Sequence, residues 1–529
     1  LELTRICFPR LNTYRLNDLS QIFNLPLASH RALDDAISCG YLLLKNLEFI
    51  GNLKPHILSI LADILKQPAN FISKFLQKKL FEKAWASKIE SPDFLFSSIV
   101  PELKYTVKSP PPKTSLISDF TLEEIEALLA KQSLWLSKYP NFEFRPSQIE
   151  MLKKISSSFL EKRFLIAEAA TGTGKSLAYL LPAILWATLK EEKVVIATHT
   201  INLQEQLFVK DLPLLQQVLD LKNVTSTVIK GRNNYLCLAK LKMHYKNALH
   251  NPSELNYFLA KIIWLESTET GDKSELNLKQ NDHGHWSNLS ADSHSCLGKK
   301  CEFYLNCYLM HARKKAEHAD ILITNHSLLL SDIKVESGVL PTYKFLIIDE
   351  AHNLEQESIN HLTIGCSSYL LYSLIKNLVQ ILELLSNFIS KIKKQKLLPA
   401  ENNCLIDLNK IKLEIQKTIS NFQESVNDLK IAINSLKLKL DEIDQNQVKW
   451  LKAAIADLSE WKIVKSAAQN VIFHLHSLTK DFSELLLQIE YIDELSFSLN
   501  INIYIQKCQE YANNLTMLLN IEEEDKVVW

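Results

Sequence analysis

A short loop at residues 169–176, AATGTGKS, contains the residue types that bind a polyphosphate. Two glycines let backbone N–H groups approach the phosphates, a lysine neutralises charge on the β- and γ-phosphates, and a hydroxyl can bind Mg²⁺. Ala169 stands at the first position of the pattern, where glycine is usual, so an ordinary strand-to-helix turn is the alternative. We predict that the loop binds ATP and Mg²⁺ through Ala170, Thr171, Gly172, Thr173, Gly174, Lys175 and Ser176.

Two adjacent carboxylates form a second candidate site in KFLIIDEAH, residues 344–352. Asp349 and Glu350 follow an apolar run, where ionised groups cost free energy unless they pair or bind a metal. Asp349 is suited to hold the Mg²⁺ that Ser176 also contacts, and Glu350 to orient or deprotonate an attacking water. With Lys175, these acids and the neighbouring His352 make up the predicted catalytic residues.

Arg145 and Gln148, in the stretch NFEFRPSQIEML, precede the loop. Their side chains can bind an adenine edge or a phosphate, so both are candidate nucleotide-binding residues. Judged on residue type alone, a solvated surface pair is the simpler interpretation.

Apolar segments around these motifs alternate with helical patterns. FLIAEA before the loop predicts a buried parallel strand, and SLAYLLPAILWATL after it predicts an apolar helix. Four further strands are predicted at residues 193–200, 226–232, 319–326 and 344–352. The alternation predicts an α/β fold with a parallel sheet that binds ligands at the carboxyl ends of its strands.

Four cysteines have the spacing of a metal site: Cys237, and then Cys296, Cys301 and Cys307 in SCLGKKCEFYLNC. Four thiolates suit a [4Fe-4S] cluster or Zn²⁺, and we favour the cluster because the spacing lacks the paired knuckles usual for zinc. The remaining cysteines lie among apolar residues and are predicted to be core. They are Cys7, Cys39, Cys366, Cys404 and Cys508.

The segment around these thiols mixes basic and aromatic residues, which suits phosphates and unstacked bases of a single strand. A solvated basic face is the alternative. The residues are Arg232, Lys299, Lys300, Arg313, Lys314 and Lys315, with Tyr235, Phe303, Tyr304 and Tyr308.

Residues 1–97 are helical in pattern and include His30 and Asp35, a histidine and a carboxylate that could meet at one metal-bound water. This stretch resembles the last motif of DEDDh-type 3′-to-5′ exonucleases. The resemblance implies that His30 is the general base and Asp35 a metal ligand. A two-metal site needs further carboxylates, so we expect no nuclease activity from this chain alone; a capping pair on a structural helix is the alternative.

A helical remainder follows from about residue 355. Its apolar positions alternate steps of four and three, which predicts a seam between packed helices rather than a ligand site. The seam residues are Ile415, Ile419, Phe422, Val426, Leu429, Ile433, Leu436 and Leu440. Residues 369–392 or the helices after Trp450 are the predicted partners.

Taken together, RPSQ, GTGKS, THTINLQEQL and DEAH resemble the first motor domain of superfamily 2 helicases, and the cysteines point to the DinG and XPD-like iron–sulfur group. The resemblance implies a RecA-like domain with an iron–sulfur insertion and a helical arch, acting on single-stranded DNA in replication or repair. The predicted regions are an exonuclease-like part (1–97), a Pro-rich linker (98–118), the motor (119–232 and 313–354), an iron–sulfur domain (233–312) and the arch (355–529).

Composition adds few limits. Lys and Arg total 60, as do Asp and Glu, so DNA binding would need local basic surface. The nine cysteines without a secretory leader favour a reducing compartment, and the longest apolar run is too short for a membrane span. We therefore expect a soluble, cytoplasmic, nucleoid-associated bacterial protein.

No second motor domain is recognisable in the sequence, and apolar VVW ends it, so we expect a truncated chain that binds nucleotide and DNA but unwinds poorly. Alternatives are a DNA-binding iron–sulfur module without ATP hydrolysis, and a zinc-containing RNA helicase.

Overall fold

The computed structural model describes most of the chain. The described residues are 1–26, 31–54, 57–58, 61, 78, 119–138, 143, 145–170, 172–221, 224–248, 252–279, 282–293, 295–334, 338–395, 402–443, 458–489 and 496–520. They form two compact units, one of residues 1–291 and 297–362, the other of residues 292–296 and 363–529. No helix of the described part is long and apolar enough to cross a membrane.

A parallel sheet is the centre of the first unit. Its strands are β1 (Val194–Thr198), β2 (Ser226–Val228), β3 (Ile321–Asn325) and β4 (Phe345–Ile348), in the order β2-β3-β1-β4. Val195 of β1 lies opposite Leu322 of β3 and Leu346 of β4. β1 and most of β3 are fully buried, as continuous apolar runs in a parallel sheet should be. The four strands predicted after the phosphate loop are confirmed.

The strand predicted at FLIAEA is wrong. Residues 163–170 have no strand hydrogen bonding, and the side chains of Phe164 and Ile166 are 107% and 99% exposed. An apolar pattern predicts burial but does not identify a hydrogen-bonding neighbour. This segment connects α9 (Pro146–Glu161) to α10 (Lys175–Lys190).

Helix α10 carries the loop into the core. Pro182 lies inside the helix, and the residues from Ala178 to Thr188 are all buried. An aromatic cluster joins α10 to β4 and to the helix before the loop: Trp186 and Phe159 contact each other and both contact Phe345. The predicted apolar helix is confirmed.

The first turn of α7 (Leu122–Ala130) is acidic, and its N-cap Thr121 accepts from Glu124 N–H.

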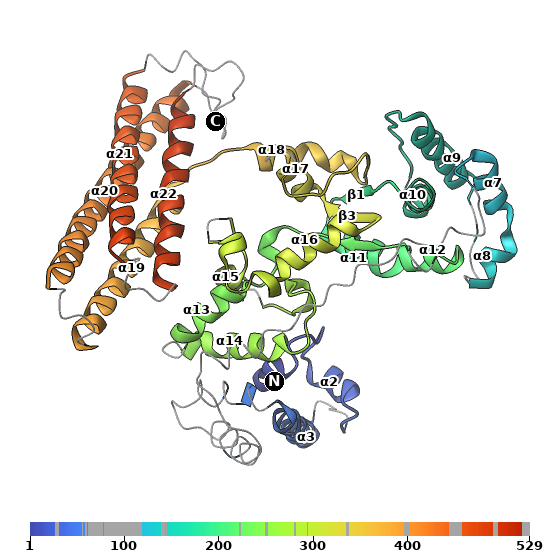
Figure 1. The fold of residues 1–529 in the computed structure, drawn as a ribbon, viewed down its shortest axis with the longest axis horizontal. Helices are drawn as coiled ribbons and strands as arrows, with labels where there is room; N and C mark the ends of the chain where they lie inside the picture. The colour runs from blue at the N-terminus through green and yellow to red at the C-terminus, as the bar shows by residue number, and fades with distance from the viewer. Residues whose placement is uncertain are drawn as a thin grey trace. The chain divides into compact units, whose positions relative to one another are not determined.

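Several further helices follow the strands along the chain (Figure 1). After β1 come α11 (Ile201–Gln206), a π-helical turn (Leu207–Asp211) and α12 (Leu212–Val218); after β3 and β4 come α17 (His326–Lys334) and α18 (Leu354–Leu362). Helix α8 (Gln132–Lys138) packs against α12.

A lobe follows β2 in the chain; we call residues 235–318 the cysteine lobe. It contains α13 (Leu238–Ala248), α14 (Pro252–Leu265), α15 (Asp282–Leu289) and α16 (Tyr308–His318), joined by short 3₁₀ turns. Its core also includes residues of α1 (Glu2–Cys7) and α3 (Ala32–Asn52), while α2 (Leu16–Ile22) packs on α3.

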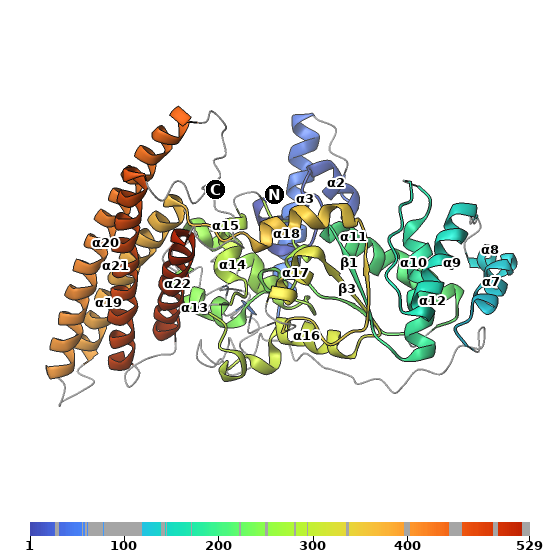
Figure 2. The ribbon, with the colours of Figure 1, turned by 90° about the horizontal axis from the view of Figure 1, so that it is seen from above.

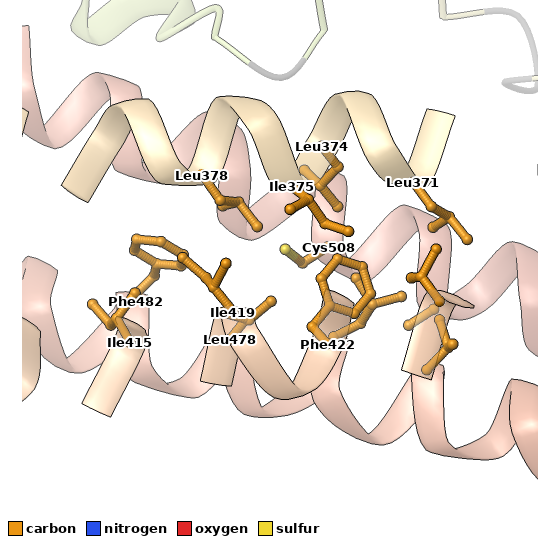
Figure 3. Close-up of a cluster of buried hydrophobic side chains, with 14 of the residues drawn as sticks. Leu371, Leu374, Ile375, Leu378, Ile415, Ile419, Phe422, Leu478, Phe482 and Cys508 are labelled. Atoms are coloured by element: carbon orange, nitrogen blue, oxygen red, sulfur yellow. The ribbon is translucent and has the colours of Figure 1, made fainter. Parts of the chain in front are cut away.

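The described residues of the second unit form mainly the long helices α19 (Ser368–Gln395), α20 (Asn402–Ile443), α21 (Ser459–Ile489) and α22 (Ser496–Leu519). They run alongside one another in both views (Figures 1 and 2). α20 packs against both α19 and α21, so both predicted partners of the seam are confirmed. Figure 3 shows Phe422 of α20 facing Leu374 and Ile375 of α19, while Phe482 of α21 lies beside Ile415 of α20.

One seam residue was predicted wrongly. Ile433 is 48% exposed, whereas the other seven are buried. Ala432 takes the buried place, because a straight helix drifts relative to a strict 3.5-residue repeat. The Pro-rich run of the linker, most of residues 59–97 and the side chain of Cys404 lie outside the described residues.

Candidate nucleotide-binding site

The phosphate loop turns into α10 through a glycine that no other residue can replace without strain. Gly174 is the N-cap of α10 and has φ +79°. A Cβ there would lie 2.2 Å from Nε2 of Gln148, which donates to the Gly174 carbonyl at 3.0 Å. Conformation and close approach therefore both require glycine. Thr171 lies outside the described residues.

Gln148 and Arg145 both lie beside this loop. Gln148 is 6% exposed, so the solvated interpretation is wrong for it. Arg145 is exposed, and its Nη1 is 3.6 Å from the position that a Cβ on Gly172 would take. The guanidinium is thus close enough to the loop to serve a bound anion, and Pro146 at the first turn of α9 fixes where the helix begins.

The loop meets the paired acids. Nζ of Lys175 is 3.3 Å from Oε1 of Glu350, and the other carboxylate oxygen of Glu350 is 3.5 Å from Nδ1 of His352. Glu350 adopts φ +53°, a left-handed conformation that is strained for a non-glycine residue and is typical of functional sites. Three predicted catalytic residues therefore lie in contact. Two of them, Lys175 and Glu350, are 175 positions apart in the sequence.

Tyr179 was not predicted and connects the two candidate Mg²⁺ ligands. Its hydroxyl donates to Oδ2 of Asp349 at 3.1 Å and also hydrogen-bonds to Ser176. Burial, followed by the charge of Asp349, raises the pKa of Tyr179 far above its ordinary value, so it stays a neutral donor. Tyr179 follows Lys175 by four residues, hence shares its helix face, and this spacing could have identified it.

These oxygens fit Mg²⁺. The ion prefers hard oxygen ligands and commonly takes one or two protein oxygens, with phosphate and water completing the shell. Ser176 and Asp349, brought together at the hydroxyl of Tyr179, supply such a pair. Nowhere in the described chain do three His, Cys, Asp or Glu side chains gather closely enough to hold a metal by themselves.

Two histidines, His326 and His199, lie near the paired acids. Nε2 of His326 lies 2.9 Å from the carbonyl oxygen of Asp349, and its ring is 5.9 Å from that of His199. Nδ1 of His199 is 4.0 Å from Glu357 of α18. Burial lowers the pKa of His326, which favours the neutral ring. Both histidines lie at or near the ends of predicted strand segments, 193–200 and 319–326. The sequence did not indicate which histidine would contact the acids.

Three of the four predicted cluster cysteines lie at the cysteine lobe core, and the fourth does not. Cys237, Cys301 and Cys307 all pack against the core of the cysteine lobe. Burial raises the pKa of Cys237 to about 11. Within the described part of the chain, these thiols are not grouped closely enough to hold a metal ion. Cys296 is exposed and belongs to the second compact unit.

Several predictions about individual side chains are corrected. Cys39 is exposed on α3 rather than core, because the apolar residues around it in sequence also face solvent; Cys7 and Cys508 are buried, and Cys366 is partly buried. Tyr235, Phe303 and Tyr308 are 3%, 8% and 1% exposed, so these rings are core and cannot stack on bases. Lys299, Lys300, Lys314 and Lys315 are exposed.

Of the exonuclease-like pair, His30 lies outside the described residues. Asp35 is in the first turn of α3, where a carboxylate complements the helix dipole. One of its oxygens is buried without a hydrogen-bond partner among the described residues.

Known proteins resemble parts of this chain. Residues 141–384 match the family described as "Type III restriction enzyme, res subunit". The "3'-5' exonuclease DinG" of Bacillus subtilis is 33% identical over 373 residues, 68% of this chain and 38% of that protein. The "ATP-dependent DNA helicase YoaA" of Haemophilus influenzae is 36% identical over 242 residues, 44% of this chain and 37% of that protein.

The "ATP-dependent helicase DinG" of Mycobacterium tuberculosis is 37% identical over 230 residues, which cover 40% of this chain and 34% of that protein. The chain spans less than half the length of each of these relatives. The matched residues include the phosphate loop and the paired acids just described. These similarities support a DinG/YoaA-type helicase family for this chain, with the matched domain at residues 141–384.

Proposed function

We propose that this chain contains the ATP-binding motor domain of a DNA helicase that acts on single-stranded DNA. The observation that carries the proposal is the contact of Lys175 with Glu350, together with Tyr179 linking Ser176 to Asp349. Four of these side chains, Lys175, Ser176, Asp349 and Glu350, supply what phosphoryl transfer needs: a cation for the phosphates, two oxygens for Mg²⁺ and a carboxylate at the attacking water.

Each residue has one task in this proposal. Lys175 leaves Glu350 and binds the β- and γ-phosphates. Ser176 and Asp349 would hold Mg²⁺, which would neutralise developing charge on the phosphates. Glu350, released from Lys175, orients the water or accepts its proton, and His352 keeps that carboxylate in place. Arg145 and Gln148 position the loop and the nucleotide.

The test is nucleotide binding by Lys175→Ala. A charge-assisted hydrogen bond contributes about 1.5–3 kcal/mol, so we expect affinity for a fluorescent ATP analogue to fall about tenfold to a hundredfold. Lys190→Ala is the matched control, because Lys190 ends the same helix and pairs with Asp119 away from the loop. Unchanged affinity in Lys175→Ala would contradict the proposed site.

DNA-stimulated ATP turnover separates helicase from the alternative of a DNA-binding module that does not hydrolyse ATP. Competition between DNA and RNA strands separates both from an RNA helicase. The relative from Haemophilus influenzae that is named a DNA helicase favours DNA, whereas the exposed lysines of the cysteine lobe could contact the phosphates of either strand.

We also propose that Cys237, Cys296, Cys301 and Cys307 hold a [4Fe-4S] cluster, with Zn²⁺ as the alternative. The spacing of the four cysteines in the sequence, and the packing of Cys237, Cys301 and Cys307 against one hydrophobic core, support this. Cys301→Ser should abolish visible absorbance and lower the iron content. Cys39→Ser should leave both unchanged, because Cys39 is exposed on α3. A protein that contains zinc but no iron would favour the alternative.

For residues 1–97 we propose the closing part of a 3′-to-5′ exonuclease domain, with His30 as base and Asp35 as metal ligand. The relative from Bacillus subtilis is named a 3'-5' exonuclease.

A further inference from the structure

A histidine side chain joins two strands that the backbone of the sheet does not join. β1 lies between β3 and β4, so no backbone ladder connects these two strands directly. His326, the first residue after β3, bridges them: its Nε2 donates to the carbonyl oxygen of Asp349, the first residue after β4, at 2.9 Å. The backbone N–H of Asp349 donates to the Ala197 carbonyl of β1 at 2.8 Å. The main chain of Asp349 is therefore held at both its N–H and its carbonyl.

Glu357 of α18 extends this connection to the end of β1. One of its carboxylate oxygens accepts from Oγ of Ser327, the neighbour of His326, at 3.1 Å and lies 3.9 Å from Nε2 of His361. The other oxygen is 4.0 Å from Nδ1 of His199, the first residue after β1. The ring of His199 lies 5.9 Å from that of His326. We call His199, His326, Ser327 and Glu357 the strand-end network, because it ties together the segments that leave three strands.

The end of β1 also determines where α11 begins. Thr200 follows His199 directly and is the N-cap of α11. Its hydroxyl accepts from the N–H of Leu203 at 3.3 Å, and its carbonyl accepts from the N–H of Gln204 at 3.1 Å. Because an N-cap fixes the first turn of its helix, a shift of His199 would displace that turn.

Helix α11 has two features of an element that can take a second position. It packs against β1 and β3 through the buried Gln204, yet neither polar atom of that side chain has a hydrogen-bond partner among the described residues. Unpaired buried polar groups destabilise the arrangement that contains them, so a displacement that pairs the amide is favoured. The π-helical turn Leu207–Asp211 follows α11 directly; such turns are frequent at functional sites, and this one can absorb the displacement.

We propose that His326 and Glu357 are positioning residues that hold Asp349 for Mg²⁺, and that the strand-end network displaces α11 when Mg²⁺ and nucleotide bind. This inference rests on the proposed nucleotide site, because Asp349 responds only if it holds the ion. Both residues act through others: His326 through the carbonyl of Asp349, and Glu357 through Ser327 and His199.

The positioning role is tested with His326→Leu and His326→Gln in the full chain. Leucine fills the buried position but cannot donate to the Asp349 carbonyl, whereas glutamine keeps a donor. Affinity for a fluorescent ATP analogue is measured with and without Mg²⁺. We expect the gain in affinity from Mg²⁺ to shrink at least about threefold in His326→Leu, as loss of a hydrogen bond implies, and to return in His326→Gln. Affinity without Mg²⁺ should stay the same, because Lys175 and its loop are intact.

The displacement of α11 is tested with Glu357→Ala, a substitution outside the core, since the Glu357 side chain is 22% exposed. Glu355→Ala is the matched control from an exposed position of the same helix. Hydrogen exchange of the Leu203 and Gln204 amides reports on α11. We expect Mg²⁺ with nucleotide to change this exchange at least about fivefold in the unmodified protein and in Glu355→Ala, which is the low end of typical coupling between sites. The change should be lost in Glu357→Ala at saturating nucleotide.

The outcomes separate this inference from the proposed function. If Mg²⁺ does not strengthen nucleotide binding in the unmodified protein, the proposed site fails and the positioning role fails with it. If Mg²⁺ strengthens binding equally in the unmodified protein and in His326→Leu, the site stands and the positioning role is overturned. Should His326→Leu fail to fold, the gain from Mg²⁺ in Glu357→Ala decides in the same way. Unchanged exchange in the nucleotide-bound unmodified protein, or an equal change in Glu357→Ala, overturns the displacement of α11.

Discussion

Without nucleotide, Lys175 forms an ion pair with Glu350, and this pair must break before Lys175 can bind a phosphate. Its side chain and that of Glu350 are each about 30% exposed, so the pair is partly screened and contributes modestly to stability. A triphosphate with Mg²⁺ offers Lys175 more negative charge than one carboxylate does, which makes the exchange favourable. The same exchange frees Glu350 for the water, so binding of nucleotide and release of the carboxylate are one event.

Gly174→Ala should damage the loop for two reasons. An alanine at φ +79° costs about 1–2 kcal/mol, and its Cβ would displace Gln148 from the Gly174 carbonyl. We expect nucleotide affinity to fall at least about tenfold, since the loop must move. Equilibrium titration with an ATP analogue measures this.

Gly284→Ala provides the matched control for that substitution. A Cβ at Gly284, inside α15, would meet no atom within 4 Å, and helical alanine is favoured over glycine by up to about 1 kcal/mol. Equal loss of affinity in both variants would show that the effect of Gly174→Ala is not local.

His326 should make stability depend on pH. Its pKa is lowered by burial from 6.5, so the unfolded chain takes up a proton first as pH falls through 6.5, and stability decreases until the folded pKa is reached. His326→Gln keeps a donor for the Asp349 carbonyl but cannot titrate. Urea unfolding followed by tryptophan fluorescence at pH 5–8 should therefore show a shallower pH dependence in the variant. His199, Glu357 and Asp349 are unchanged in both proteins, so parallel curves would contradict this role.

The sequence predicted the principal residues of the site but not their supports. Lys175, Asp349 and Glu350 were predictable because their chemistry depends on type and on position at strand and helix ends. Tyr179 and His326 were not, because a tyrosine on an apolar helix and a histidine after a strand have many possible environments. Burial of the rings of Tyr235 and Tyr308 was missed for the same reason.

At the scale of elements, periodicity predicted four strands and the long helices correctly. It failed at residues 164–169, where an apolar run has no hydrogen-bonded neighbour, and at Ile433, where the helix drifts from its seam. Both errors have one cause: a local pattern describes which residues prefer burial, and the partner element decides which of them achieve it.

The seam of α20 gives a matched pair of substitutions. Phe422→Ala empties a fully buried position between α19 and α21 and should cost about 3–5 kcal/mol. Ile433→Ala removes an exposed side chain and should change stability by less than about 0.5 kcal/mol. Hydrogen exchange in α20 and α21 of the full chain measures both.

Similar losses at the two positions would mean that Ile433 is also a core residue. Little effect from Phe422→Ala would mean that the four-helix core does not depend on its central aromatic ring.

At the scale of the whole molecule, the chain places its nucleotide site and all of its cysteine lobe except residues 292–296 in one compact unit. Buried Lys230 joins them: its Nζ lies 2.7 Å from Asp272 of the lobe and 3.1 Å from Glu205 of α11. Removing one partner of such a buried pair leaves an uncompensated charge, so this junction is costly to disrupt. The N-terminal helices dock on the other side of the lobe core, which makes the lobe a common support for the exonuclease-like segment and the motor.

The central claim is that a Mg²⁺-bound triphosphate lies between the phosphate loop and the paired acids. Equilibrium titration of ATP with and without Mg²⁺, in the unmodified protein and in Asp349→Asn, tests it most directly. Asparagine keeps an acceptor for Tyr179 but loses the charge that holds the ion. We predict that Mg²⁺ raises affinity at least about tenfold in the unmodified protein, or about 1.4 kcal/mol, and much less in Asp349→Asn. An equal effect of Mg²⁺ in both proteins would contradict the claim.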